Sequence, residues 1–227
     1  MTAPGSTSAT TLLVIAKQPA PGRVKTRLVP PCTYDQAAGL AEAALADTLH
    51  TVLKTPAARR VLVLEGEPGP WLPAGFDVVP QCGGPLDERL AAAFAGVRGP
   101  ALLIGMDTPQ VTPGLLAVDW AAADAVFGPA ADGGFWALGL RVPDPALLRG
   151  VPMSTSETGA IQRARLLSAG LRVAGLPLLR DVDTAADALA VAREAPRSRF
   201  AALARELSGV LSPVGRATGR DVVRETA

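Results

Sequence analysis

Short apolar runs alternate along this chain with longer stretches in which apolar residues recur every three or four positions. The clearest runs are TLLVIA at 11–16, VLVL at 61–64 and ALLIG at 101–105. Runs of this length that contain β-branched residues are typical of buried strands, and the longer period is typical of helices that pack one face on a sheet. Strands that alternate with helices predict an α/β three-layer sandwich around a mainly parallel sheet.

The same patterns predict the remaining elements. Thr33 and Gln36, and again Ser154 and Glu157, have capping-box spacing, which satisfies the free N–H groups at a helix start. Pro113 suits the first turn of a short helix. We therefore expect strands at 76–79, 125–127, 135–140 and 171–174, and helices at 33–52, 86–97, 113–120, 154–169, 184–194 and 199–207.

The chain of 227 residues is long enough for one large domain. No internal repeat or Pro/Ser-rich linker divides it, so we expect a single domain over 11–207 with tails at 1–10 and 208–227. No apolar run approaches the roughly 18 residues of a membrane helix, and the start of the chain lacks the basic region of a signal peptide. Cys32 and Cys82 form no Cys-x-x-Cys pair, which favours a reduced, cytoplasmic protein.

The charge balance excludes several kinds of partner. Lysine and arginine total 22 and aspartate and glutamate 21, which gives a formal net charge of +1. Such a balance argues against bulk electrostatic binding to nucleic acid or to an anionic membrane. His50 is the only histidine, which rules out a multi-histidine metal site and makes a histidine-based triad a poor expectation.

A basic loop, AKQPAPGRVKTRL at 16–28, follows the first strand. Ligands of open α/β sheets bind beyond the carboxyl ends of the strands, where this loop begins. Its four cations suit a di- or triphosphate, although a solvated basic loop is the plainer interpretation. Neither a Walker loop nor a G-x-G-x-x-G pattern is present. The predicted phosphate-binding residues are Lys17, Arg23, Lys25 and Arg27.

Two acidic motifs are candidate metal sites. Asp107, in GMDTP at 105–109, directly follows the central strand, and a hard oxygen ligand there can hold Mg²⁺ together with phosphate oxygens. A turn or a helix cap is the alternative for this residue. Asp183, in DVDT at 181–184, suits a metal ligand and a helix cap equally well, because Thr184 and Asp187 have capping-box spacing.

Two glycine-containing motifs complete the candidates. In GPAADGGFW at 128–136, the glycines would let an acceptor approach the backbone while Asp132 orients it, although Asp-Gly-Gly also forms plain turns. In QCGGPLDER at 81–89, the glycine pair would admit a flat base, but a simple strand-to-helix turn explains the motif as well. The predicted acceptor residues here are Asp132, Gly133, Gly134, Phe135 and Trp136, and the predicted base and donor residues are Gln81, Gly83, Gly84 and Arg89.

In this order, the motifs at 16–28, 105–109, 128–134 and 181–184 resemble the bacterial DUF2064 family. Its members have a GT-A, Rossmann-like fold, are often labelled glycosyltransferases, and are linked to nucleotide-diphospho-sugar transferases. The resemblance covers roughly 11–207 and implies that Asp107 and Asp183 hold Mg²⁺ or Mn²⁺. It also adds Ser154 and Thr155 to the acceptor residues. The KTRL segment is similar to that of phospholactate guanylyltransferases, and DVDT is similar to a metal-proximal motif of some cytidylyltransferases.

These motifs together predict a Mg²⁺-dependent transferase with a nucleotide donor. The first hypothesis is nucleotidyl transfer from a nucleoside triphosphate to a small, phosphorylated acceptor, with Lys25, Asp107 and Asp132 as the catalytic residues. The second is glycosyl transfer from a nucleotide sugar, for which Asp132 is the candidate acceptor base. A non-catalytic nucleotide-binding domain is the third.

Overall fold

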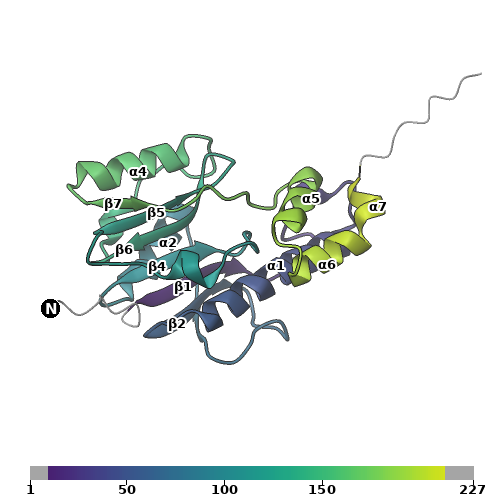
Figure 1. Ribbon diagram of the computed structural model, residues 1–227, viewed down its shortest axis with the longest axis horizontal. Coiled ribbons are helices and arrows are strands. Elements are labelled where there is room, and N and C mark those ends of the chain that lie inside the picture. Colours follow the sequence, from purple (N-terminus) through teal and green to yellow (C-terminus); the bar gives the residue numbers. More distant parts are fainter. Residues whose placement is uncertain (1–9, 213–227) are drawn as a thin grey trace, which may run out of the picture.

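The computed structural model describes residues 10–212. Seven strands form one sheet in the order β3-β2-β1-β4-β6-β5-β7, and β6 runs antiparallel to both of its neighbours (Figure 1). The predicted α/β fold with a mainly parallel, mixed sheet is therefore confirmed. The strands are β1 (Thr11–Lys17), β2 (Arg59–Glu65), β3 (Asp77–Pro80), β4 (Ala101–Gly105), β5 (Ala125–Pro129), β6 (Phe135–Leu140) and β7 (Val173–Gly175).

Helices cover both faces of this sheet and a further group lies beside α1 (Figure 1). Because successive side chains of a strand point to opposite faces, Leu12 and Val14 pack on one side and Leu13 on the other. The helices are α1 (Tyr34–Lys54), α2 (Leu86–Ala95), α3 (Pro113–Leu116), α4 (Thr158–Ser168), α5 (Ala185–Glu194), α6 (Arg199–Glu206) and α7 (Ser208–Leu211), with short 3₁₀ turns η2 (Thr26–Leu28) and η3 (Pro145–Leu147).

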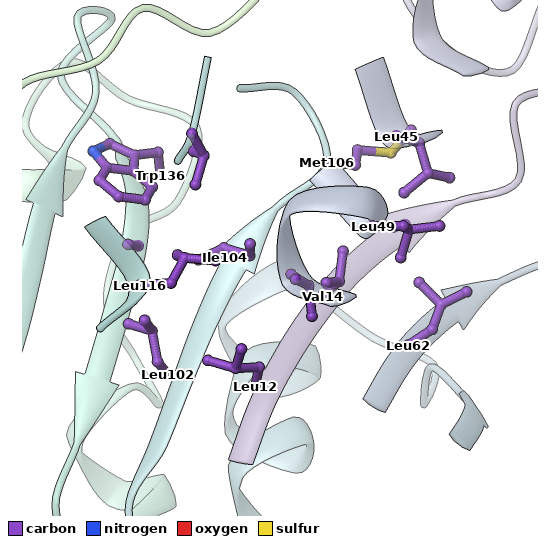
Figure 2. Packing of buried hydrophobic residues seen from close by; sticks show 14 of the residues in the cluster. Leu12, Val14, Leu45, Leu49, Leu62, Leu102, Ile104, Met106, Leu116 and Trp136 are labelled. Carbon is purple, nitrogen blue, oxygen red and sulfur yellow. The ribbon is translucent and has the colours of Figure 1, made fainter. Parts of the chain in front are cut away.

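Three apolar clusters hold these elements together. The first lies between the sheet and α1, where Leu45 and Leu49 meet Val14 and Leu62 (Figure 2). The second lies on the opposite face, beneath α2 and α4. The third joins the outer face of α1 to α5, α6 and α7 around Phe200. Full burial of one such large apolar side chain stabilises a protein by about 1.5–3 kcal/mol.

Two predicted helix boundaries are wrong. The capping box at Ser154 and Glu157 does not form: α4 begins at Thr158, and the Glu157 side chain makes no capping hydrogen bond. Ser154 instead has a left-handed backbone, with φ at 59°. The short helix predicted over 113–120 ends at Leu116.

The predicted tails differ in part from the structure. Residues 208–211 form α7, and Leu211 is buried in the third cluster. Thr10 is also buried, and its hydroxyl accepts a hydrogen bond from the Trp120 indole N–H at 2.7 Å. The rest of both predicted tails, 1–9 and 213–227, lies outside the described residues. Among the described residues, no helix has the length and apolar character needed to cross a membrane.

The start of α4 is fixed by a close backbone contact. The Gly159 N–H donates to the Gly133 carbonyl at 2.8 Å. A Cβ atom on Gly159 would lie 2.5 Å from the Gly134 carbonyl oxygen, and one on Gly133 would lie 2.1 Å from the Ser156 carbonyl oxygen. Glycine at these positions therefore lets the helix start touch the turn between β5 and β6.

Asp124 links the ends of β6 and β7 at one edge of the sheet. Its carboxylate forms ion pairs with Arg141, which follows β6, and with Arg172, which precedes β7, the latter at 2.9 Å from Nε. The hydrogen bonds from Arg172 come first among the causes that lower the pKa of Asp124 to about 2, and Arg141 adds to them. An ordinary aspartate has a pKa of about 3.9 in an unfolded chain.

We predict that Asp124→Asn destabilises the protein in a pH-dependent manner. A carboxylate whose pKa falls on folding contributes stability above its unfolded value and loses that contribution as the pH drops through its folded value. The difference in urea midpoint between wild type and variant should therefore be largest above pH 5 and shrink towards pH 2. Asp77→Asn, which removes an exposed pair with Arg59, is the control and should have a small effect. A difference in urea midpoint that stays constant over this pH range would contradict the lowered pKa of Asp124.

A second prediction concerns Gly159→Ala. The new Cβ would overlap backbone atoms of the β5–β6 turn, so the cost should be about 1–3 kcal/mol of unfolding free energy despite the better helix propensity of alanine. Chemical denaturation measures this change. Gly209→Ala is the matched control, because Gly209 is also helical and a Cβ there meets nothing within 4 Å. Equal stability of the two variants would show that the close contact is unimportant.

Candidate functional site

A cleft of about 530 Å³ opens at the carboxyl ends of the parallel strands. Its walls come from the loop after β1, the segment after β4, the β5–β6 turn and the segments before α4 and α5. Most of the residues predicted from the sequence line it: Lys17, Arg23, Lys25, Arg27, Gln81, Arg89, Asp107, Asp132, Gly134, Phe135, Trp136, Ser154, Thr155 and Asp183. Gly83, Gly84 and Gly133 do not line it.

Lys25 lines this cleft between carboxylates of two other segments. Its Nζ is 3.0 Å from Oδ2 of Asp107 and 3.1 Å from Oδ1 of Asp183. The side chain is only 7% exposed. Burial by itself would lower the pKa of Lys25, but the charges and hydrogen bonds of the two carboxylates outweigh it and raise the pKa. The ammonium group is therefore held charged between two carboxylates.

The loop after β1 is anchored so that Lys25 faces the cleft. Val24 is buried in the cluster under α1, and Leu28 is buried in the cluster around Phe200. Lys25 itself takes the left-handed backbone conformation, with φ at 49°, at the start of η2. Non-glycine residues seldom adopt this conformation, and it occurs often at functional sites.

Asp183 joins the basic loop from the other side. Its Oδ2 accepts a hydrogen bond from Arg27 at 2.8 Å, while its Oδ1 contacts Lys25. The helix cap considered for Asp183 is formed by its neighbour: the Thr184 hydroxyl accepts from the N–H of Asp187, and the Asp187 carboxylate accepts from the N–H of Thr184. Asp183 is thus free of the capping role and faces the cleft.

Sequence reasoning missed Asp181, which lies beside Asp183 in the cleft. The segment after β7 continues alongside β5, because Leu179 N–H donates to Pro129 at 3.1 Å, and this brings Asp181 next to the β5–β6 turn. Carboxylate oxygens of Asp132, Asp181 and Asp183 lie within 4.8 Å of one another. The spacing of two residues offered the signal, since alternate residues of an extended chain point the same way.

These carboxylates suit a hard divalent cation. Burial, followed by the charges of Asp132 and Asp183, raises the pKa of Asp181 to about 6. Asp107 adds a buried Oδ1 without a hydrogen-bond partner among the described residues. Oxygen ligands of this kind are preferred by Mg²⁺ and related ions.

Glu65 is a second residue that sequence reasoning missed. It ends β2 at the same edge of the sheet, and position alone could have identified it. Its carboxylate lies 2.7 Å from Arg89 Nη1, 3.5 Å from Lys17 Nζ and 3.9 Å from Arg23 Nη2. One acidic side chain thus gathers three of the cations that line the cleft.

Gln81 lines the cleft, but its side-chain amide is bonded within the protein. Its amide nitrogen donates to the carbonyl oxygens of Ala16, at 2.7 Å, and Val63, at 3.2 Å. Its Oε1 accepts from Arg89 at 3.1 Å. Both amide N–H groups are engaged by the backbone, so Gln81 positions Arg89 instead of offering a free amide to a base.

The β5–β6 turn places Asp132 at the rim of the cleft. Its Oδ1 accepts from the Gly134 N–H at 2.8 Å, which rigidifies the turn. Gly133 lies against Ser156 and not in the cleft, so its predicted acceptor contact is not supported by its position. Trp136 is buried and its indole N–H donates to Pro177, although part of the side chain lines the cleft.

Comparisons with solved structures place this arrangement in a known fold. A protein from Desulfovibrio desulfuricans G20 that carries the provisional name nucleotide-diphospho-sugar transferase is 27% identical, with a TM-score of 0.80 over 89% of this chain and 96% of that chain. A CMP:2-keto-3-deoxy-manno-octonic acid synthetase solved with CTP is 14% identical, with a TM-score of 0.54 over 88% of this chain and all of that chain (100%).

A nucleotidyl transferase from Methanothermobacter thermautotrophicus is 16% identical, with a TM-score of 0.52 over 81% of this chain and 95% of that chain. At these identities, the last two likenesses show the fold alone. No curated protein matches the chain in sequence. Residues 40–155 match the family model described as an uncharacterized protein conserved in bacteria, and the chain therefore belongs to the DUF2064 family.

Proposed function

We propose that this transferase moves a nucleotidyl group from a nucleoside triphosphate to a small acceptor and releases pyrophosphate. The observation that carries the proposal is the position of Lys25, whose Nζ lies within 3.1 Å of carboxylates from two distant loops inside one cleft. Cationic groups bind phosphate oxygens and carboxylates bind Mg²⁺, so a site for a polyphosphate with its metal ion uses both kinds of side chain.

The donor phosphates would lie among the cations that line the cleft. Lys25 is nearly buried, whereas Arg23 and Arg27 are well exposed and have room to turn towards a ligand. Arginine binds phosphate oxygens through its planar fork, and lysine binds as a point charge. The lining cations are Lys17, Arg23, Lys25, Arg27 and Arg89.

The chain's acidic residues fit a resident Mg²⁺ or Mn²⁺ ion. Asp183 is the central candidate ligand, because it faces Asp107 across the Lys25 ammonium and also belongs to the group with Asp132 and Asp181. When bound, such an ion would neutralise phosphate oxygens. Asp107 lies on the other side of the Lys25 ammonium, with its Oδ2 at 3.0 Å from Nζ.

The reaction needs little covalent chemistry from the protein. An acceptor oxygen attacks the α-phosphorus of the triphosphate, and the bond from that phosphorus to the leaving pyrophosphate breaks. Lys25, Arg23 and Arg27 would stabilise the charge that builds on the leaving group. The low exposure of Lys25 strengthens this interaction, because fewer water molecules screen it.

Glycosyl transfer from a nucleotide sugar is the second candidate. It is favoured by the D. desulfuricans protein, whose provisional name is nucleotide-diphospho-sugar transferase. Asp132 lies at the rim of the cleft and would act as the acceptor base. The five lining cations favour the first candidate, because a triphosphate carries more charge than a nucleotide sugar.

Product analysis separates the two reactions. The protein is incubated with Mg²⁺ or Mn²⁺, a pool of small acceptors, and either nucleoside triphosphates or nucleotide sugars. We predict that pyrophosphate appears with the triphosphates and that no nucleoside diphosphate appears with the nucleotide sugars. The opposite pattern would assign the protein to glycosyl transfer.

We also predict that Lys25→Ala and Asp107→Asn each lower kcat/KM by about 10²–10³, since removal of one charge-stabilising contact commonly has this effect. Both residues lie at the cleft, and neither belongs to the main apolar clusters, so far-ultraviolet circular dichroism should show an unchanged fold. Lys54→Ala and Asp77→Asn are matched controls on exposed positions away from the cleft and should keep full activity. Activity near wild type in Lys25→Ala or Asp107→Asn would refute this site.

A further inference from the structure

The Asp183 carboxylate is in contact with two cations of its own chain. Its Oδ1 lies 3.1 Å from Lys25 Nζ, and its Oδ2 accepts a hydrogen bond from Arg27 Nη1 at 2.8 Å. The same carboxylate belongs to the group with Asp132 and Asp181, whose oxygens lie within 4.8 Å of one another. A divalent ion held by this group has to share Asp183 with one of the two basic side chains or replace it.

The two cations on Asp183 are held with different strength. Lys25 is only 7% exposed and is also paired with Asp107 at 3.0 Å. Arg27 is 76% exposed, and Asp183 is its only ion-pair partner among the residues that the structure describes. An exposed ion pair contributes little stability, because water screens the charges and a long side chain loses freedom when it is held in place. Arg27 is therefore the partner that Asp183 can exchange.

The Arg27 side chain is placed to bind a phosphate group after it leaves Asp183. It lines the same cleft as Lys17 and Arg23. Its neighbour Leu28 is buried in the cluster around Phe200, so the backbone of η2 is anchored and only the Arg27 side chain has to turn. A guanidinium group binds phosphate through two parallel hydrogen bonds, whereas a carboxylate whose charge is neutralised by a metal ion is a poorer partner for it.

We propose that Arg27 couples metal binding to donor binding: it pairs with Asp183 in the free protein and moves to the donor phosphates when a divalent ion binds to that carboxylate. The proposal rests on the divalent ion and the polyphosphate donor of the proposed function. Competition for Asp183 means that Arg27 weakens metal binding to the free protein. Thermodynamic linkage is reciprocal, so release of Arg27 strengthens donor binding by the factor by which the donor strengthens metal binding.

Titration of the free, full-length protein with Mn²⁺ tests the competition without any substrate. The electron paramagnetic resonance signal of unbound Mn²⁺ gives the dissociation constant. We expect Arg27→Gln to bind Mn²⁺ about two- to fivefold more tightly than wild type, which is the range for loss of one exposed ion pair. Arg23→Gln is the matched control, because it removes the same charge from the same loop but Arg23 pairs with Glu65 at 3.9 Å. If Arg27→Gln binds Mn²⁺ no more tightly than Arg23→Gln, the proposal is overturned.

Asp183→Asn shows whether the titrated ion binds at this carboxylate. The substitution keeps the size of the side chain and removes the charge for which Arg27 and the ion compete. We expect Asp183→Asn to bind Mn²⁺ at least tenfold more weakly than wild type, with an unchanged far-ultraviolet circular dichroism spectrum. In the double variant, Arg27→Gln should no longer strengthen Mn²⁺ binding. An effect of Arg27→Gln that persists without the Asp183 charge would contradict an exchange at Asp183.

The coupling itself is measured with a nucleoside triphosphate that stabilises the protein in a thermal-shift assay. Its dissociation constant is determined by calorimetry without a divalent ion and at saturating Mn²⁺, and the ratio of the two values is the coupling factor. Binding of Mn²⁺ to the triphosphate in solution is the same for every variant and cancels in the comparison. We expect the coupling factor to fall about two- to fivefold in Arg27→Gln and to stay at the wild-type value in Arg23→Gln. An unchanged factor in Arg27→Gln refutes the coupling.

Failure of this proposal and failure of the proposed function give different results. Equal Mn²⁺ affinities of Arg27→Gln and Arg23→Gln overturn the exchange at Asp183, whether or not pyrophosphate is released from a triphosphate. Tighter Mn²⁺ binding by Arg27→Gln, without pyrophosphate release from any triphosphate, means that nucleotidyl transfer alone has failed. The coupling factor is then measured with a nucleotide sugar, whose diphosphate offers Arg27 the same kind of oxygen ligand.

Discussion

The contact of Lys25 with two carboxylates is the interaction on which the candidate site depends. Lys25 and Asp183 are 158 positions apart in the chain, and their side chains meet at 3.1 Å. A lysine ammonium that is nearly buried is stable only with anionic partners, because burial otherwise favours its neutral form. Asp107 and Asp183 supply those partners, and so the basic loop, the central strand and the segment before α5 are held at one point.

The apolar cluster around Phe200 gives this contact its rigidity. Leu28 ends the basic loop and Val182 lies between Asp181 and Asp183, and both are buried in that cluster. The Asp47 carboxylate of α1 accepts hydrogen bonds from the first N–H groups of α6, at 3.1 and 2.9 Å, and so links α6 to α1. The helices after β7 therefore hold the basic loop and the segment with Asp181 and Asp183 on one shared apolar cluster.

Charge is distributed in the cleft by the order of the strands. The lining cations come from the end of β1, the loop after it and α2, and the lining carboxylates follow β4, β5 and β7. Because β1 and β4 are neighbours at the middle of the sheet, the two sets meet there and little elsewhere. Glu65 and Gln81 add a supporting layer, since they hold Arg89 among the lining cations.

Local sequence patterns were sufficient to predict the helices and strands and the mainly parallel sheet, because hydrophobic periodicity follows from backbone geometry. They also predicted the edge of the sheet at which the charged residues gather, because ligands of such sheets bind beyond the carboxyl ends of the strands. They were also sufficient for the capping box at Thr33, where both partners lie within one turn. Only the tertiary structure decided which charges pair, that Gln81 bonds the backbone, and that Gly159 fixes the start of α4. These outcomes depend on atoms from segments far apart in the chain, whose distances no local pattern contains.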